Sequence, residues 1–307
     1  MSDTIYDAII IGGSFAGLSA ALQLGRARRK VLVIDEGLRR NRFASHSHGF
    51  ITQDGVDPAA IAATARSQVS KYPTVRWLSG RADTVHSIPY GARTAASFEV
   101  MVGDTRNLSK TLILAVGLKD ILPGIEGLEE RWGKSVFHCP YCHGYELNQG
   151  QIGVIAGSEL SMHQALMLPD WGPTTLIIND AFEPNADHLE SLAARGVTVE
   201  RSAVEAVKGH ADVQLADGRT LSFSGLFVLA PFEIGSAIPH QLGLDLEPGP
   251  LGSIIKTDPM KETSMPGVYA CGDAARAMAS VALAVADGNL AGIGAHKSLI
   301  LGAISHG

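Results

Sequence analysis

A tight glycine turn between an apolar run and a helix constrains this chain more than any other feature. Residues 7–11 form a short run that is apolar after Asp7, residues 15–27 are rich in alanine and leucine, and the segment Gly12-Gly13-Ser14-Phe15-Ala16-Gly17 joins the two. A second apolar run, residues 31–35, ends at Asp35. A strand, a glycine turn, a helix and another strand form the βαβ unit of doubly wound α/β domains. The pattern therefore predicts a parallel sheet with a nucleotide at the turn.

The turn follows the pattern G-x-G-x-x-G with one replacement. Gly12 makes the tight bend and Gly17 allows close helix–strand packing, while Ser14 stands where the second glycine is expected. Serine is small and keeps a hydrogen-bond donor, so a pyrophosphate can still approach. Asp35 and Glu36 end the next strand, where an acidic side chain accepts a ribose hydroxyl.

A second unit of this kind predicts the domain organisation. An apolar run at 152–156 is followed by Gly157-Ser158, a helix from Ser161 and another run at 174–178. Later, residues 267–271 lead into Gly272-Asp273 and an alanine-rich helix from about 280. We expect an α/β fold with two Rossmann-like doubly wound nucleotide-binding domains, the second inserted into the first. The expected bounds are 1–118 with 246–307 for the first domain, and 119–245 for the second.

Length and charge exclude several classes of protein. The 307 residues suit two domains, and 25 basic against 31 acidic residues give −6, the wrong sign for a nucleic-acid binder. No run approaches the about 18 consecutive apolar residues of a membrane span. The N-terminus lacks the basic region of a secretory signal, so we expect a cytoplasmic protein that binds neither nucleic acid nor membrane.

The segment His138-Cys139-Pro140-Tyr141-Cys142-His143 carries the clearest reactive chemistry. Three cysteines are too few for a disulfide framework, so the C-x-x-C pair indicates redox catalysis or metal binding. The attacking sulfur must be a thiolate, and an imidazole on either side can lower a thiol pKa and carry its proton. We therefore take Cys139, Cys142, His143 and His138 as the candidate catalytic residues.

Three alternatives to redox catalysis stay open. Cys-x-x-Cys-His also marks covalent haem attachment, which requires an exported chain. A zinc site would crowd His138, Cys139, Cys142 and His143 into six residues, whereas structural zinc sites draw a second ligand pair from farther away, so we expect no metal. The two cysteines could also be inert core residues. Cys271 stands alone in an apolar run and is expected to be buried.

Four segments in order resemble the two-domain, low-molecular-weight thioredoxin reductases: residues 12–17, 115–117, 139–142 and 269–273. The resemblance covers essentially the whole chain and implies FAD in the first domain and a homodimer. It also implies that Cys142 faces the flavin as the charge-transfer thiol and that Cys139 exchanges with the substrate. His143 stands where the family usually places an acidic proton donor.

The resemblance further implies a set of cofactor-binding residues. Asp35, Glu36, Arg40 and Asn41 would meet the adenosine side, and Asp273 the ribityl chain. The flavin ring would lie near the helix start at 280–282 and near the loop 45–49, whose histidines could equally be solvated. The complete set is Gly12, Ser14, Phe15, Ala16, Gly17, Asp35, Glu36, Arg40, Asn41, His48, Val85, Ala115, Gly117, Gly272, Asp273, Ser280, Val281 and Ala282.

The second turn is poorly suited to NADPH, which the inserted domain of such reductases binds. Its three glycine positions hold Ala156, Ser158 and Ser161, and Glu159 adds a negative charge. The next strand leads into Asn179-Asp180, where the family usually has a histidine-arginine-arginine run. Residues 119–245 hold 7 basic and 17 acidic residues, a net charge of 7 − 17 = −10, and residues 135–194 hold no Lys or Arg. Since a phosphate needs cationic partners, NADP(H) binding is doubtful.

The segment Cys-Pro-Tyr-Cys-His-Gly-Tyr-Glu is similar to that of the dithiol oxidases of the gliotoxin and holomycin type. That resemblance implies the reverse electron flow, from a substrate dithiol through Cys139-Cys142 to FAD and then to oxygen. The main alternative is a reductase that takes electrons from NAD(P)H or a reduced protein and passes them to a thioredoxin-like protein. A flavin-binding redox sensor without turnover is a third. The expected partner is thus a small-molecule dithiol or a thioredoxin-like protein.

Overall fold

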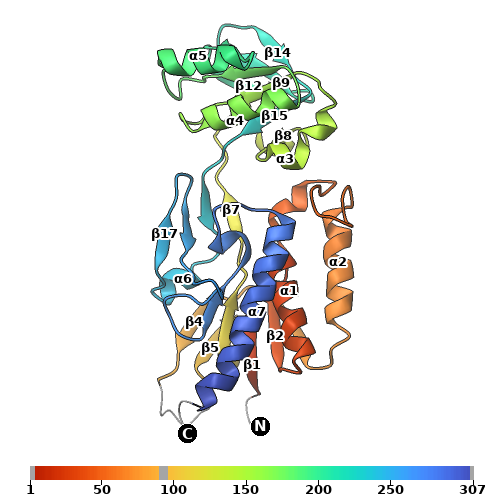
Figure 1. The fold of residues 1–307 in the computed structure, drawn as a ribbon, viewed down its shortest axis with the longest axis vertical. Coiled ribbons are helices and arrows are strands. Elements are labelled where there is room, and N and C mark those ends of the chain that lie inside the picture. The colour runs from red at the N-terminus through yellow and green to blue at the C-terminus, as the bar shows by residue number, and fades with distance from the viewer. Residues whose placement is uncertain (1–3, 90–95, 305–307) are drawn as a thin grey trace. The chain divides into compact units, whose positions relative to one another are not determined.

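The computed structural model describes residues 4–89 and 96–304, and the chain divides into two compact units (Figure 1). Unit 1 takes the segments Met1–Arg40, Ala59–Lys119 and Phe232–Gly307; unit 2 takes Asn41–Pro58 and Asp120–Pro231. Two segments depart from the expected bounds: residues 41–58, expected in the first domain, group with unit 2, and residues 232–245, expected in the inserted domain, group with unit 1. The second departure is due to apolar packing, because Ile238, Leu242 and Leu244 are buried in the core of unit 1.

The sheet of unit 1 has seven strands in the order β3-β2-β1-β6-β5-β4, with β19 also paired to β6. The first apolar run of the sequence becomes its centre, since Ile9 of β1 lies opposite Leu32 on one side and Leu112 on the other. The pairs β4–β5 and β5–β6 are antiparallel, and the other pairs of this sheet are parallel. The strands are β1 (Ile5–Ile11), β2 (Val31–Asp35), β3 (Val75–Ser79), β4 (Thr84–Ser87), β5 (Phe98–Val102), β6 (Thr105–Leu114) and β19 (Val268–Ala270).

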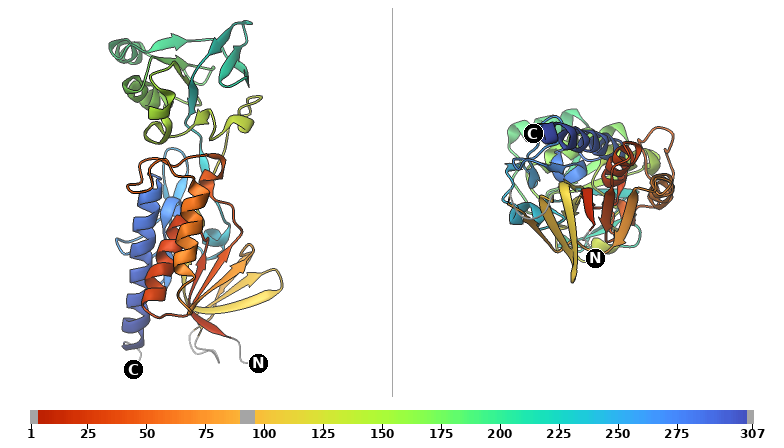
Figure 2. Two further views of the ribbon diagram at one scale, coloured as in Figure 1. Left: turned by 90° about the vertical axis from the view of Figure 1, so that its right-hand side faces the viewer. Right: turned by 90° about the horizontal axis from the view of Figure 1, so that it is seen from below.

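Helices α1 (Phe15–Arg26), α2 (Pro58–Val69) and α7 (Val281–Ile304) lie side by side on one face of this sheet (Figures 1 and 2). Helices α1 and α7 pack closely because α7 presents glycines to α1: a Cβ at Gly288 would lie 2.0 Å from the Ala16 carbonyl oxygen. The other face is covered by shorter elements, which are α6 (Ile238–Gln241), β16 (Phe232–Ile234), β17 (Leu246–Pro248) and β18 (Ser253–Ile255).

Unit 2 is built on a five-stranded parallel sheet in the order β11-β10-β9-β15-β8. Its strands are β8 (Val136–Phe137), β9 (Ile152–Ile155), β10 (Thr174–Ile177), β11 (Thr198–Glu200) and β15 (Gly225–Val228). Successive residues point to opposite faces. Val154 packs in a cluster with residues of α4 (Ser161–Met167) and α5 (Ala186–Ala194), whereas Ile155 packs against the antiparallel sheet β12 (Val204–Lys208), β13 (Asp212–Leu215) and β14 (Thr220–Ser222).

The remaining short elements are β7 (Leu118–Asp120), the short helix α3 (Pro140–His143) and five 3₁₀ turns, η1 (Arg40–Phe43), η2 (Glu129–Arg131), η3 (Tyr145–Leu147), η4 (Leu168–Asp170) and η5 (Gly272–Ala275). In each unit a turn follows the central parallel strand and leads into a helix, β1 into α1 and β9 into α4. These two turns are therefore equivalent places in the two sheets. Within the described residues, no helix combines the length and the apolar character needed to cross a membrane.

Candidate active site

The turn after β1 is built so tightly that only glycine fits at its two ends. Gly12 has φ +100°, and a Cβ there would lie 2.2 Å from the Ala115 carbonyl oxygen. A Cβ at Gly17 would lie 1.9 Å from the Gly12 carbonyl oxygen. Ser14 precedes α1 without a side-chain hydrogen bond to the helix, and the first helical turn has no acidic residue. The N–H groups of this helix start are thus open to an anion.

Asp35 and Trp77 line the same turn. One carboxylate oxygen of Asp35 accepts a hydrogen bond from the Gly13 N–H, at 2.9 Å, while the neighbouring Glu36 is exposed. A Cβ at Gly13 would lie 2.8 Å from the Trp77 ring, and the buried Nε1 of Trp77 has no hydrogen-bond partner among the described residues. Because a buried donor is rarely left unpaired, this indole indicates a ligand at the turn. Sequence reasoning missed Trp77, whose only signal is its place on the strand after Asp35.

Segments far apart in the sequence meet at this turn. Gly272 has φ +71°, and a Cβ there would lie 2.9 Å from the Ala16 Cβ. Asp273 accepts a hydrogen bond from Arg40 at 2.9 Å, so two residues assigned to different parts of the cofactor form an ion pair. The hydroxyl of Ser280 accepts from the Leu283 N–H, at 3.2 Å, where α7 begins.

Other residues predicted to bind the cofactor have side chains that are buried in the fold. Phe15 and Ala16 bury their side chains and would meet a phosphate through their main chain. The side chain of Val85 is 2% exposed in the core, and its N–H donates to Gln241 Oε1 at 3.1 Å. The fold thus uses Val85 for packing, and its cofactor role stays a prediction, as do those of Gly117, Val281 and Ala282.

Taken together, the turn of unit 1 fits FAD at its nucleotide end. Gly12 and Gly17 leave a cradle that a side chain would fill, the helix start is open to a pyrophosphate, and Trp77 offers an unpaired donor.

The dithiol lies in unit 2, where β8 leads into α3. Cys139 has extended backbone angles and precedes the helix, and Pro140 occupies the first helical position, which suits its fixed φ. The helix ends at Gly144, where a Cβ would lie 2.7 Å from the Trp171 ring. This short turn holds both sulfurs on one side, and the Cys142 thiol donates to Cys139 Sγ at 2.9 Å.

The two thiols differ in acidity because they share one proton. The hydrogen bond from Cys142 lowers the pKa of Cys139 to about 7. The same bond raises the pKa of Cys142, and burial and the carboxylate of Glu146 raise it further. Cys139 is therefore the thiolate of the reduced pair. Cys271, in contrast, is fully buried in unit 1, and burial raises its pKa to about 12. It was expected to be buried, and it is.

His143 is a neutral imidazole beside the dithiol. Its ring stacks on Phe137 with centroids 4.3 Å apart, and neither ring nitrogen has a hydrogen-bond partner in the described part of the chain. Burial, and secondly the proximity of His48, lowers its pKa to about 4. At neutral pH His143 can accept a proton but does not hold one. His138, the other candidate, has its carbonyl oxygen bonded by Gln164 Nε2 at 2.6 Å.

His48 lies in the same unit as the dithiol. The loop that carries it is closed by the pairing of Ser47 with Val56, and the Gly49 N–H donates to Asp54. Nδ1 of His48 is 3.4 Å from Glu146 Oε1 and 3.6 Å from Asp54 Oδ1. Glu146 thus interacts both with His48 of this loop and with Cys142. The spacing of these residues in the sequence does not predict that interaction. Asn41 begins the segment of unit 2 that contains this loop, and its buried Oδ1 has no partner among the described residues.

In the turn after β9, a main-chain N–H group is hydrogen-bonded to a side chain of the same turn. The Gly157 N–H donates to Ser161 Oγ at 3.2 Å, so a side chain of the protein uses a donor that a phosphate would need. Glu159 lies 3.5 Å from His188, and α4 has only seven residues. The loop after β10 contains Asn179 and Asp180, both with positive φ, and Asn179 accepts from the Val204 N–H.

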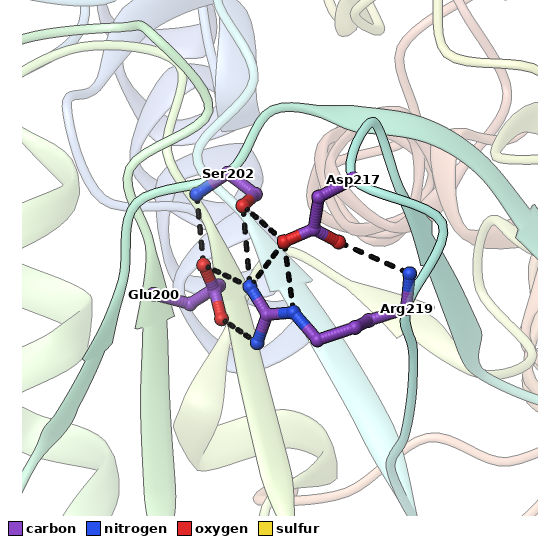
Figure 3. Close-up of polar contacts among 4 residues, drawn as sticks. All are labelled: Glu200, Ser202, Asp217 and Arg219. Carbon is purple, nitrogen blue, oxygen red and sulfur yellow. Dashed lines mark hydrogen bonds and ion pairs between the residues drawn. The ribbon is translucent and has the colours of Figure 1, made fainter.

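The arginines at and beyond the end of β11 are neutralised by carboxylates. Arg219 donates to both oxygens of Glu200, at 2.8 and 3.0 Å, and to Asp217 (Figure 3). These bonds lower the pKa of Glu200 and that of Asp217, and they raise that of Arg219. Arg201 donates to Glu183 at 2.7 Å. Each of these cations already has an anionic partner, as the acidic composition of the domain requires.

Comparison with known proteins places this architecture in a family. Residues 6–288 match the family described as pyridine nucleotide-disulphide oxidoreductase. The chain belongs to this family. It is 33% identical over 314 residues to "Thioredoxin reductase tcpT" of Claviceps purpurea, covering 97% of this chain and 96% of that protein. It is also similar to the crystal structure of an oxidoreductase from Agrobacterium tumefaciens, with 54% identity, a TM-score of 0.93 and coverage of 97% and 99%.

A further solved structure, that of HlmI, is 32% identical with a TM-score of 0.89 and covers 98% of this chain and 95% of that one. The protein is therefore a flavin-dependent disulfide oxidoreductase of the thioredoxin reductase type, and its family typically binds FAD. The seven-stranded and five-stranded sheets of this mixed α/β fold agree with two nucleotide-binding domains. No group of three or more His, Cys, Asp or Glu among residues 4–89 and 96–304 could hold a metal ion.

Proposed function

We propose that this protein is a dithiol oxidase that closes a disulfide in its substrate through Cys139 and Cys142. Two electrons and two protons leave the substrate dithiol, and an external acceptor such as oxygen takes them up as hydrogen peroxide. The observation that carries the proposal is a contrast within unit 2. A redox-competent dithiol, with sulfurs 2.9 Å apart, shares the unit with a nucleotide turn whose Gly157 N–H is bonded by its own Ser161.

The cofactor in this proposal is FAD, which when bound supplies a two-electron acceptor. Gly12, Ser14 and Gly17 would admit its pyrophosphate to the start of α1, with Asp35, Glu36 and Trp77 near the ribose. Asp273, fixed by Arg40, would meet the ribityl chain, and residues 280–282 the flavin ring.

The exchange steps follow from the acidity of the two thiols. One substrate thiolate attacks the sulfur of Cys139 in the Cys139–Cys142 disulfide, forming a mixed disulfide and releasing the Cys142 thiolate. The second substrate thiol then attacks the substrate sulfur of the mixed disulfide, and Cys139 departs as a thiolate. A lower leaving-group pKa speeds this departure, which matches the lowered pKa of Cys139.

His143 acts as the base for the substrate thiols in this scheme. Neither ring nitrogen has a hydrogen-bond partner among the described residues, so a substrate thiol can donate its proton towards one of them. Proton transfer by a positioned side chain contributes about 10²- to 10⁴-fold, so His143→Ala is expected to lower turnover by that factor. If the turnover rate of this variant is unchanged, His143 is not the base and His138 becomes the candidate.

A reductase remains the second candidate, because the family and a similar protein are named for pyridine nucleotides and for thioredoxin reduction. In that function NAD(P)H or a reduced protein would supply electrons to a thioredoxin-like protein. Two observations argue against NADPH: the Gly157 N–H is hydrogen-bonded within its own turn, and Arg201 and Arg219, near the end of β11, already have carboxylate partners.

We also propose a cytoplasmic homodimer. Leu290, Ile293 and Ile300 are spaced along one face of α7 and are 36–43% exposed. Apolar side chains at this spacing suit contact with a second copy. Sedimentation would test this assembly.

The deciding experiment is oxygen uptake by the purified yellow protein with a panel of dithiols, with and without NADPH. We expect oxygen uptake that depends on the dithiol and has the same rate with and without NADPH. Rapid anaerobic bleaching of the flavin by NADPH would overturn the oxidase proposal, and no uptake with any dithiol would favour a redox sensor. Cys142→Ser should abolish flavin reduction by dithiols, whereas Cys139→Ser should leave a thiolate that gives a long-wavelength absorption band.

A further inference from the structure

A carboxylate lies on the side of the dithiol turn that carries the Cys142 sulfur. Glu146 follows Cys142 by four residues, and the backbone between them stays helical, because Gly144 after α3 has φ −68° and ψ −37° and η3 comes next. Side chains four residues apart in such a turn are neighbours on one face. After the effects of Cys139 and of burial, the negative charge of Glu146 further raises the pKa of Cys142. Sequence spacing and electrostatics thus place Glu146 beside this thiol.

Glu146 is paired with His48, which the loop 45–56 brings from far along the chain. Nδ1 of His48 lies 3.4 Å from Glu146 Oε1 and 3.6 Å from Asp54 Oδ1. The loop is closed by main-chain hydrogen bonds at Ser47. The side chain of His48 is 18% exposed, against 41% for Glu146. The imidazole is therefore the more enclosed member of the pair, and it gives the flexible carboxylate a fixed partner.

The titratable neighbours of this pair are two further histidines. The ring centroids of His46 and His48 lie 6.3 Å apart. Burial, and secondly the charge of His48, lowers the pKa of His143, so His48 also lies near that ring. Among the described residues, Glu146 is the carboxylate whose charge acts on the Cys142 thiol.

The reaction includes a proton transfer at Cys142. In the reduced pair Cys139 is the thiolate and Cys142 keeps its proton. When the pair closes to the disulfide, the two sulfurs give up two electrons to FAD, and Cys142 gives up one proton. A base next to Cys142 speeds this step, because the thiolate is the form of the sulfur that reacts.

We infer that the carboxylate of Glu146 accepts the proton of Cys142 when the dithiol closes to the disulfide, and that His48 is the residue that positions this carboxylate. The inference rests on the proposed function and deepens it, since it assigns the proton transfer at the second sulfur. From Glu146 the proton passes to solvent, to which this side chain is open. The reverse transfer returns a proton to Cys142 after a substrate has released it as a thiolate.

The test follows the sulfurs alone: the fully reduced holoenzyme is mixed anaerobically with one equivalent of dithiodipyridine, an uncharged disulfide. The Cys139 thiolate attacks first, forming a mixed disulfide and releasing one thiopyridone. Cys142 then loses its proton, attacks Cys139 Sγ and releases the second. Glu146→Gln is expected to slow the second release about 10²-fold and to leave the first unchanged, and Glu146→Asp should recover part of the loss. Asp54→Asn, which removes the other carboxylate beside His48, is the matched control and should keep both rates.

A second measurement tests whether Glu146 faces Cys142. In the Cys139→Ser variant, the pH midpoint of alkylation by iodoacetamide reports the Cys142 thiol, because Cys271 is fully buried. Adding Glu146→Gln removes a negative charge and should lower this midpoint by about one pH unit. An unmoved midpoint would overturn the inference.

Three outcomes of the mixing experiment would overturn it as well. A second release that is unchanged or faster in Glu146→Gln would show that the carboxylate only opposes ionisation of Cys142. Equal slowing of both releases would show that the substitution acts on the structure and not on the proton. His48→Ala should slow the second release but add no loss to Glu146→Gln, because it acts through Glu146, and an added loss would remove its positioning role. These measurements do not need oxygen uptake, so the proposed function can fail separately.

Discussion

Substituting alanine for Gly12 tests the cofactor cradle, and the same change at Gly157 is its matched control. Each glycine stands at the turn after the central strand of its unit. At Gly12 the added Cβ would lie 2.2 Å from the Ala115 carbonyl oxygen, which is 3.0 − 2.2 = 0.8 Å closer than real Cβ contacts allow. The obstacle is main chain, and φ is +100°. At Gly157 the nearest atom is 4.0 Å away, and its φ is not in the left-handed region.

The expected magnitude follows from these two numbers. A side chain held at an unfavourable positive φ costs about 1–3 kcal/mol, and the clash with Ala115 must be relieved in addition by moving β6 away from the turn. Gly12→Ala should therefore lower the free energy of unfolding by at least this amount and should disturb the close approach of the pyrophosphate. Gly157→Ala should change the free energy of unfolding by less than about 0.5 kcal/mol, because it meets open space.

The assay is the flavin absorbance per protein after purification, together with urea unfolding followed by tryptophan fluorescence. Gly12→Ala is expected to purify with little flavin and to unfold at lower urea, and Gly157→Ala to behave as the wild type in both. If Gly12→Ala retained full flavin and wild-type stability, the turn after β1 would not be the cradle. If Gly157→Ala lost flavin as well, the contrast between the two turns would be wrong.

Three further predictions concern individual groups. Cys142→Ala removes the thiol donor, so the pKa of Cys139 should rise from about 7, and the midpoint of its alkylation by iodoacetamide should move to higher pH; an unmoved midpoint would mean that another donor lowers it. Burial holds the pKa of folded His143 at about 4, below the ordinary 6.5, so the wild type loses unfolding free energy as the pH falls from 6.5 towards 4, by up to about 3 kcal/mol. His143→Phe should lose less over this window in urea denaturation, and equal losses would show that the imidazole is solvated. Arg219→Gln breaks an exposed ion pair, so it should leave the free energy of unfolding nearly unchanged and leave NADPH-driven flavin reduction unaltered; slower reduction would place Arg219 in a nucleotide site.

Much of the fold could be predicted because it depends on local patterns. The apolar run at 7–11, the glycine turn and the helix after it became β1 and α1, with Gly12 and Gly17 where only glycine fits. The second βαβ unit appeared where its pattern indicated, as β9, α4 and β10. Strand alternation, turn glycines and helix starts are decided within a few residues, so they are visible in the sequence.

The boundary of the inserted domain was less accessible. We expected it at residue 245, whereas the chain re-enters unit 1 at Phe232. No glycine or charge pattern separates residues 232–245 from what precedes them. Their grouping is decided by burial of Ile238 and Leu242 against a sheet that the sequence assembles from distant strands.

The sequence by itself determined which chemistry this protein can carry: a C-x-x-C dithiol, one sound glycine turn, one degraded turn and an acidic inserted segment. Only the tertiary structure decided what each group does, because pKa values and ligand access depend on neighbours far along the chain. In the tertiary structure the Gly157 N–H of the second turn donates to Ser161 Oγ, Arg219 pairs with Glu200 across 19 residues, and Trp171 packs against Tyr141 of α3. The tertiary structure also half-buried His143 and left it neutral, a property that the spacing of residues in the sequence does not encode.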